Sequence, residues 1–312
     1  MRAYMAGTGR FLPPDVLTNA DFVRMVDTSD EWIVGHTGIR TRHIARTVKN
    51  ADMAEAAARA AMENAGCAPA DIDMVVVSTV TPDRAYPSLA CDLQNRLGLP
   101  DVFCLDVSAA CSGFIYAVDL AARHILTGGA RTALVVSSEK LTPTVDYTDR
   151  ASCILFGDGA GAVVLKGDER QGGGWLGSLL AARGDDGAAL QCVPGGRIKM
   201  DGHEVFRFAV RVMPEVIEKL LARAGRAVSD CKFIIPHQAN LRIIKAVQRR
   251  YALPEEKMVV TIDRYGNMSS ACIPIALDEL NRAGRLEPGD LLLAVGFGAG
   301  FTYGATLFEW SE

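Results

Sequence analysis

An internal repeat at a fixed offset constrains this chain of 312 residues more than any other feature of its sequence. Residues 65–71, which lead into the apolar run 74–77, have a counterpart 159 positions later in residues 224–230, which lead into the apolar run 233–235. The same offset carries residues 133–136 onto 292–295 and Cys111 onto Ser270. Several matches in one register predict a duplication. The glycine run at 172–174 predicts a boundary between residues 1–170 and 171–312.

Within each half, short apolar runs alternate with longer helical patterns. In the first half the pattern predicts helices over 52–65, 88–97 and 112–126, and strands over 74–77, 102–107, 133–136 and 162–165. This alternation predicts an α/β fold whose strands are largely buried. A chain of this length, 49% hydrophobic, can bury a large core.

Cys111 stands where the strand run 102–107 gives way to the helical run 112–126. Unpaired N–H groups and the helix macrodipole favour a thiolate at such a junction, and backbone donors there can stabilise an oxyanion. The alternative is a small, inert buried cysteine, because free cysteine is among the most buried residue types. This segment alone leaves both interpretations open.

Three motifs of the second half also carry chemical groups. His237 directly follows a buried strand, at the end where α/β sheets bind ligands. Asn267 precedes a helical pattern, and residues 296–301 form a glycine-rich turn between apolar strands. Taken singly, a histidine at a strand end is more often a structural residue, and an asparagine before a helix is more often an N-cap or turn residue. The glycine turn is not a dinucleotide fingerprint, because no helix follows it.

The composition excludes several classes of function. A net charge of −4 gives no reason to expect nucleic-acid binding. The eight cysteines form no C-x-x-C pair and no zinc-type cluster, so we expect no metal. The N-terminus lacks a signal-peptide pattern, and no uncharged apolar run reaches membrane-spanning length. We therefore expect a cytoplasmic protein with reduced thiols and no membrane contact.

Taken together, the motifs resemble those of the β-ketoacyl-acyl carrier protein (ACP) synthase III family along the whole chain. The motifs that carry the resemblance are residues 28–33 (TSDEWI), 37–40 (TGIR), 110–114 (ACSGF), 156–162 (FGDGAGA), 236–243 (PHQANLRI) and 263–267 (DRYGN). The resemblance implies the thiolase fold, in which two βαβαβαββ halves build five layers in the order α-β-α-β-α.

The same resemblance implies a mechanism. Cys111 would take an acyl group from an acyl-CoA, and malonyl-ACP would then lose CO₂ and attack it. His237 and Asn267 would hold the enolate oxygen, and the backbone N–H groups of Cys111 and Ala299 would form an oxyanion hole. A macrodipole contributes at most about 2 kcal/mol, so we expect the His237 imidazole to help lower the pKa of the thiol. CoA enters as a thioester substrate, and no cofactor is implied.

The resemblance further implies binding surfaces. Tyr86 would close the acyl pocket of a partner in a homodimer, and a basic helical face would dock ACP through Arg242, Lys245, Arg249 and Arg250. His36 stands where the family often has arginine, and His203 where it often has asparagine. The residues expected to contact CoA are Trp32, His36, Thr37, Arg150, Met200, Gly202, His203, Phe206, Ala239 and Phe297.

Three competing functions remain at this point. A related condensing enzyme of secondary metabolism would keep the cysteine, histidine and asparagine but use other acyl groups. A thiolase is disfavoured, because no motif supplies its second catalytic cysteine. A non-catalytic acyl-CoA or acyl-carrier binding module would require an unreactive Cys111.

Overall fold

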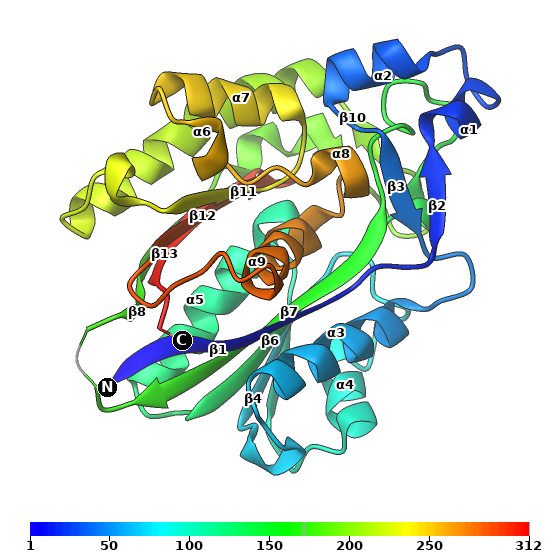
Figure 1. The fold of residues 1–312 in the computed structure, drawn as a ribbon. Helices are drawn as coiled ribbons and strands as arrows, with labels where there is room; N and C mark the ends of the chain where they lie inside the picture. Colours follow the sequence, from blue (N-terminus) through cyan, green and yellow to red (C-terminus); the bar gives the residue numbers. More distant parts are fainter. Residues whose placement is uncertain (171, 312) are drawn as a thin grey trace.

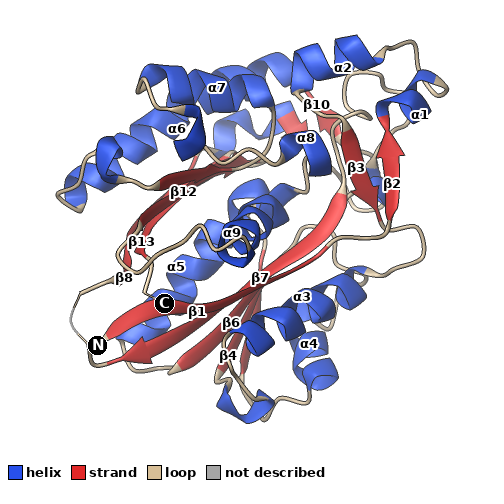
Figure 2. Cartoon of the chain, in the orientation of Figure 1, coloured by secondary structure: helices blue, strands red, loops and turns tan. Residues whose placement is uncertain are grey.

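The computed structural model describes residues 1–170 and 172–311. Two sheets and three layers of helices alternate in it, as Figure 1 shows. Helices α3 (Asn50–Asn64) and α4 (Leu89–Leu97) cover the outer face of the first sheet. Helices α5 (Gly113–Leu126) and α9 (Cys272–Arg282) lie between the sheets, and α6 (Gly202–Arg223) and α7 (Leu241–Arg250) cover the second sheet (Figure 2). This is the expected α-β-α-β-α order of the thiolase fold.

The two sheets have matching strand orders. The first runs β1-β7-β6-β4-β5, with β4 parallel to β5 and β6, and β7 antiparallel to β6 and β1. The second runs β11-β12-β13-β8, with β11 parallel to β12 and the other pairs antiparallel. Ile234 of β11 also forms a parallel bridge with Met258, in the place that β5 takes in the first sheet. The strands are β1 (Arg2–Phe11), β4 (Met74–Ser78), β5 (Phe103–Val107), β6 (Thr132–Lys140), β7 (Asp158–Asp168), β8 (Gly174–Ala182), β11 (Phe233–Pro236), β12 (Leu291–Gly298) and β13 (Thr302–Glu309).

Element boundaries confirm the duplication and its offset of 159 residues. Helix α5 begins at Gly113 and α9 at Cys272, while β6 begins at Thr132 and β12 at Leu291. Each middle helix is preceded by a 3-10 turn, η2 (Ala110–Ser112) or η7 (Ser269–Ala271). The first residue of each turn lies in the left-handed region, with φ of 44° at Ala110 and 49° at Ser269.

The remaining elements are short and lie outside the two main sheets. An insertion after β1 contains two helices between the strands of a two-stranded antiparallel sheet, and a loop after β8 contains another short two-stranded sheet. These elements are β2 (Asp15–Thr18), α1 (Asn19–Val23), α2 (Asp30–Thr37), β3 (Thr41–Ile44), β9 (Leu190–Gln191) and β10 (Lys199–Met200), and the short helix α8 (Ile262–Tyr265) follows later in the chain. The remaining 3-10 turns are η1 (Pro69–Asp71), η3 (Thr142–Thr144), η4 (Gly184–Ala189), η5 (Val228–Asp230) and η6 (Glu255–Lys257).

Burial follows the layers. Helix α5 lies between two sheets, so it buries apolar side chains such as Phe114, Ile115 and Val118 on more than one face. Strand β4 is buried throughout, as predicted. Strand β5 departs from the expectation of buried strands, because it lies at a sheet edge and leaves Phe103 and Leu105 exposed by 46% and 37%.

Every strand of the first sheet ends before residue 169 and every strand of the second begins after residue 173, so we keep the proposed boundary between 170 and 171. Within the described ranges, no helix is long and apolar enough to cross a membrane. In the same ranges, no three His, Cys, Asp or Glu side chains group as metal ligands would.

Candidate active site

The tertiary structure brings Cys111 and His237 together around the end of strand β12. A Cβ atom placed on Gly298 would lie 2.4 Å from the Cys111 backbone nitrogen, so the two backbones are in direct contact. A Cβ atom on Gly296 would lie 3.4 Å from His237 Cβ and 3.5 Å from the Cys111 carbonyl oxygen. The nucleophile candidate of the first half therefore lies beside the histidine of the second.

Asn267 joins this group through Ser269. The Ser269 backbone N–H donates to Asn267 Oδ1 at 2.8 Å, and the Ser269 hydroxyl is near enough to the Cys111 thiol to lower its pKa. Asn267 is 6% exposed, and its backbone pairs with Leu155 and Gly157 of the first half. Because its carbonyl oxygen is occupied, the side-chain NH₂ group is left as a donor.

The local structure at Cys111 differs from a helix terminus. Cys111 lies inside the turn η2, and α5 begins only at Gly113. Burial raises the pKa of the Cys111 thiol to about 12, and the nearby Glu139 charge raises it further, while the Ser269 hydroxyl lowers it. The expected depression of this pKa by the helix is therefore outweighed in the unliganded site, because desolvation favours the neutral thiol.

His237 is buried at 1% exposure, and burial lowers the pKa of its imidazole to about 3. Its ring meets Phe297 edge-on with centroids 5.8 Å apart, and no described residue hydrogen bonds its Nδ1 atom. The imidazole is therefore neutral and can donate one N–H. A neutral ring cannot lower the thiol pKa by its charge, so the expected help from His237 would have to come through a hydrogen bond from that N–H.

Ala299 follows Gly298 in the turn between β12 and β13. The Thr302 hydroxyl donates to the Ala299 carbonyl at 3.2 Å and to the Ala109 carbonyl at 2.8 Å. These bonds fix the glycine-rich turn against the residues that precede Cys111. Ala299 therefore lies one residue from the backbone contact between Gly298 and Cys111.

The residues expected at the nucleotide end of CoA lie on and beside α2. The Arg150 guanidinium lies 4.3 Å from the centre of the Trp32 ring, and the His36 ring stacks on Trp32 with centroids 4.2 Å apart. Thr37 is buried, and its hydroxyl donates to the Ile33 carbonyl and accepts from the Ile39 N–H. The Thr37 hydroxyl therefore already has two hydrogen-bond partners within the protein.

A hydrogen bond joins α2 to the start of α7. Asn240 caps α7 and donates from its side chain to the His36 carbonyl at 3.0 Å, and Ala239 lies between Asn240 and His237 in the sequence. Phe206 lies 5.6 Å beneath the Arg242 guanidinium. The remaining residues expected to line the tunnel gather at the start of α6, namely Met200, Gly202 and His203.

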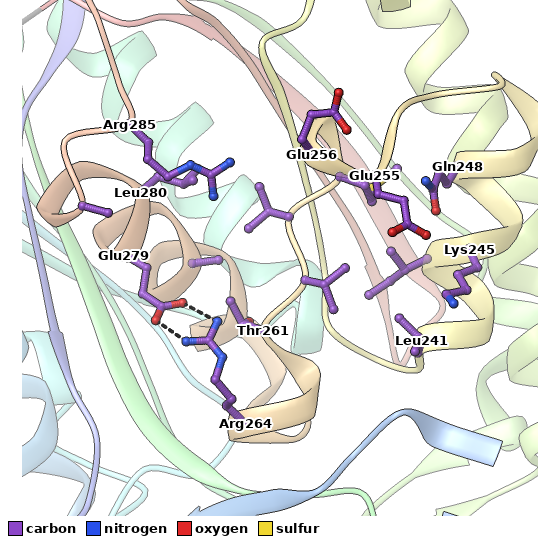
Figure 3. Close-up of a pocket in the computed structure, with 16 residues that line it drawn as sticks. Leu241, Lys245, Gln248, Glu255, Glu256, Thr261, Arg264, Glu279, Leu280 and Arg285 are labelled. Atoms are coloured by element: carbon purple, nitrogen blue, oxygen red, sulfur yellow. Dashed lines mark hydrogen bonds and ion pairs between the residues drawn. The ribbon is translucent and has the colours of Figure 1, made fainter. Parts of the chain in front are cut away.

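The predicted basic face of α7 is exposed, opposite its buried residues Ile243, Ile244 and Val247. Arg250 forms an ion pair with Glu218 at 3.0 Å. Lys245 borders the hollow of Figure 3, whose rim also holds Glu255 and Glu256. The hollow continues to α8 and α9, where Arg264 of α8 and Glu279 of α9 are paired in Figure 3. Its lining residues do not include Cys111, His237 or Asn267.

Tyr86 lies on the surface of the described structure. Its side chain is 86% exposed in the loop between β4 and α4. The exposure leaves it accessible to a second molecule.

Sequence reasoning missed Glu139 and Ser269. Glu139 is fully buried at the end of β6, where it accepts hydrogen bonds from Ser269 and Ser270 at 3.1 Å each. A glutamate three residues after the apolar run 133–136 was a usable signal, since an ionisable group near a buried strand end is costly unless it has a role. Ser269 gave no such signal, because serine before a helix is common.

Comparison with known proteins gives a consistent result. Sequence models described as 3-Oxoacyl-[acyl-carrier-protein (ACP)] synthase III and its C terminal match residues 105–184 and 221–310. A relative from Geobacillus kaustophilus, named Beta-ketoacyl-[acyl-carrier-protein] synthase III, is 49% identical over 100% of both chains. The crystal structure of 3-oxoacyl-[acyl-carrier-protein] synthase III from Aquifex aeolicus superposes with a TM-score of 0.96 at 44% identity, covering 99% of this chain and 100% of the other. The priming β-ketosynthase of the R1128 polyketide pathway superposes at 0.94 with 36% identity, covering 100% and 97%.

Proposed function

The chain belongs to the 3-oxoacyl-[acyl-carrier-protein] synthase III family, and on this premise we propose that it transfers an acyl group from acyl-CoA to Cys111 and condenses it with malonyl-ACP. The reaction releases CO₂ and yields β-ketoacyl-ACP, which initiates fatty acid synthesis. One observation carries the proposal: Cys111 of one half and His237 of the other meet at the end of β12, with Asn267 hydrogen bonded to Ser269, whose hydroxyl lies near the thiol.

In the first half-reaction, the Cys111 sulfur attacks the thioester carbonyl and CoA leaves. The tetrahedral intermediate carries a negative oxygen, which the backbone N–H groups of Cys111 and Ala299 stabilise. The direct packing of Gly298 on the Cys111 nitrogen supports this assignment, because it fixes the spacing of the two segments that supply the donors.

In the second half-reaction, the C–C bond to the malonyl carboxylate breaks and CO₂ leaves. The electron pair forms an enolate whose carbon attacks the acyl-Cys111 carbonyl, and the Cys111 thiolate is released. His237 and Asn267 donate hydrogen bonds to the enolate oxygen. Their neutral state supports this role, since a buried neutral imidazole and a side-chain amide each offer an N–H donor.

The coenzyme would bind with its adenine at Trp32. The adjacent Arg150 guanidinium and His36 ring supply a stacking surface and a cation near the nucleotide. Histidine is shorter than arginine and mostly neutral at pH 7, so we expect a weaker contact with phosphate at position 36 than an arginine would give. The pantetheine arm would follow Phe206 and Ala239 to Phe297 and Cys111.

ACP, an acidic partner, would dock on α7, beside the residues expected to bind CoA. Glu218 pairs with Arg250, and Glu255 lines the same hollow as Lys245, so nearby carboxylates offset the charge of these two residues. We therefore expect Arg242 and Arg249 to contribute most to the binding of ACP.

The protein would act as a homodimer in the cytoplasm. Strand β5 hydrogen bonds only to β4 among the described strands, and its exposed Phe103 and Leu105 supply apolar area beside an open strand edge. Pairing of two β5 edges would cover this surface and bring Tyr86 toward the partner's acyl pocket.

Mass spectrometry of the intact protein after incubation with acetyl-CoA tests the first step. We expect a gain of one acetyl group, located on Cys111 by peptide mapping, and its loss when malonyl-ACP is added. The variant Cys111→Ala should fold normally and remain unmodified. A normal rate of condensation by that variant would refute the proposal, and a wild-type protein that binds acyl-CoA without modification would be a binding module.

A second candidate is a priming condensing enzyme of secondary metabolism, favoured by the likeness to the polyketide priming ketosynthase. A panel of acetyl, branched and longer acyl-CoA substrates separates the two. A preference for acetyl-CoA or short branched primers with malonyl-ACP supports fatty acid synthesis, and exclusive use of other acyl groups supports the second candidate.

A further inference from the structure

Two hydroxyl groups join the turn η2 to the glycine-rich turn between β12 and β13. Thr302 is the first residue of β13 and pairs with Gly298, the last residue of β12, so residues 299–301 form the turn between them. Ser112 is fully buried, and its hydroxyl lies 2.8 Å from Thr302 Oγ1 and 2.8 Å from the Ala109 carbonyl oxygen. We call the hydroxyls of Ser112 and Thr302 the hydroxyl clamp. Neither has a part in the mechanism above.

The hydroxyl clamp connects the two residues expected to form the oxyanion hole. Each hydroxyl has one proton and two acceptor positions, so Ser112 can donate to Thr302 while Thr302 donates to the Ala299 carbonyl, 3.2 Å away. This chain of hydrogen bonds begins one residue after Cys111 and ends on Ala299. In the alternative arrangement of protons, Thr302 donates to the Ala109 carbonyl at 2.8 Å, which joins the same two segments.

The backbone before the nucleophile has a conformation that needs support. Ala110 lies in the left-handed region with φ of 44°, which is uncommon for a residue with a Cβ atom. Such a conformation persists only where the surrounding contacts hold it, and it concentrates at functional sites. The Ala109 carbonyl, directly before it, lies within hydrogen-bond distance of the Ser112 N–H at 3.2 Å and of both hydroxyls of the clamp.

The equivalent turn of the second half has no hydroxyl on this carbonyl. Residues 268–271 correspond to residues 109–112 at the offset of 159, and both turns have the left-handed first residue. Among the described residues, the donor to the Met268 carbonyl is the Ala271 N–H, at 3.1 Å, and Ala271 takes the place of Ser112. A turn of this kind therefore forms without a clamp on this carbonyl. The clamp is present at the turn that carries the nucleophile.

We propose that Thr302 is a positioning residue for acylation, whose hydroxyl, together with that of Ser112, holds the N–H groups of Cys111 and Ala299 at the spacing that an oxyanion requires. Thr302 acts through the backbone of Ala299, and the proposal rests on Cys111 as the acyl carrier. The negative oxygen exists only in the tetrahedral intermediate and the transition states beside it. Loss of the clamp should therefore slow the chemical step of acylation and leave the binding of acetyl-CoA unchanged.

Acylation by acetyl-CoA, measured by rapid-quench mass spectrometry, tests the clamp. Thr302→Val keeps the shape of the side chain but removes its hydroxyl. We expect the maximal acylation rate of Thr302→Val to fall by about tenfold, while the half-saturating concentration of acetyl-CoA stays within about twofold of wild type. Thr302→Ser keeps the hydroxyl and should retain at least about a third of the wild-type rate. Ser112→Ala should lose less than Thr302→Val, because Thr302 keeps its own hydrogen bonds to Ala109 and Ala299.

Thr306 provides a matched control on the same strand. It is fully buried, and its hydroxyl accepts from Trp175 Nε1 at 3.0 Å and from Ser178 Oγ at 2.9 Å, both on β8. Thr306→Val therefore also removes a hydroxyl that joins two segments, but not at the site. Urea unfolding should show that both valine variants are folded and less stable than wild type, because each leaves polar groups without a partner. Acylation of Thr306→Val should stay within about twofold of wild type.

Alkylation of Cys111 by iodoacetamide separates an effect on the oxyanion from an effect on the thiol. This reaction forms no oxyanion, so its rate in Thr302→Val should stay within about threefold of wild type. The proposal is overturned if Thr302→Val acylates at the wild-type rate, if Thr302→Ser is as slow as Thr302→Val, or if Thr306→Val slows equally. It is also overturned if alkylation slows as much as acylation, because the hydroxyl would then act on the thiol. A wild-type protein that is alkylated at Cys111 but never acetylated would instead refute the proposed function.

Discussion

The contact between Gly298 and Cys111 makes a quantitative prediction for the substitution Gly298→Ala. The added Cβ would lie 2.4 Å from the Cys111 nitrogen and 3.2 Å from its Cα, where ordinary contact begins at 3.4 Å. The atoms on both sides belong to the backbone, so no side chain can rotate away. The end of β12 and the turn η2 must therefore separate by about 1 Å.

A displacement of this size at a reacting centre costs about 10²-fold in rate, and overpacking of this kind destabilises a protein by about 1–3 kcal/mol. Gly296→Ala on the same strand is the matched control, because its added Cβ meets nothing closer than 3.4 Å. We expect Gly298→Ala to lose about 10²-fold in the acylation rate measured by rapid-quench mass spectrometry, and Gly296→Ala to keep at least a third of it. Urea unfolding should give the order wild type, Gly296→Ala, Gly298→Ala. Equal acylation rates of the two variants would refute the close contact as the determinant of this geometry.

Three further predictions follow from the site and its surfaces. Asn267→Asp keeps an acceptor for the Ser269 N–H but replaces the amide donor by an anion. It should therefore reduce the rate of malonyl-ACP decarboxylation at least tenfold more than the rate of acylation. Equal losses in the two half-reactions would contradict the division of roles. Arg249→Glu should raise the KM for malonyl-ACP more than Arg250→Glu does, because Glu218 already pairs with Arg250, and neither should change acylation by acetyl-CoA. The pKa of the Glu139 carboxyl group is raised, so between pH 4.5 and about 7 the native state keeps this group protonated while the unfolded state releases the proton, and the free energy of unfolding of the wild type falls as pH rises through that range. Urea unfolding should therefore show Glu139→Gln gaining up to about 3 kcal/mol of stability relative to wild type across the range. A difference that does not change with pH would exclude a titrating Glu139.

The sequence predicted the fold to the level of individual elements. The 159-residue offset located the equivalent helices and strands of both halves, because their apolar patterns repeat in one register. The strand at 74–77 and the helix at 88–97 were also correct to within a residue or two. Local patterns succeed here because buried strands and amphipathic helices depend mainly on the spacing of apolar residues.

The chemical state of the site was less predictable. The position of Cys111 near a helix start suggested a lowered thiol pKa, yet burial raises it to about 12. The His237 imidazole was expected to help lower the thiol pKa, and burial lowers the pKa of the imidazole itself to about 3. Burial depends on the packing of both halves around these side chains, which no local segment encodes.

The sequence by itself determined the duplicated α/β architecture and the identity of Cys111, His237 and Asn267 as candidates, since periodicity and motif spacing are local properties of the chain. The tertiary structure alone decided that β5 leaves an apolar edge exposed and that Gly298 lies in close contact with the Cys111 backbone. It also decided that the Ser269 hydroxyl donates to the buried Glu139 carboxyl group, 130 residues away along the chain. Hydrogen bonding and desolvation act through space over a few ångströms, so they are fixed only when the two halves pack against each other.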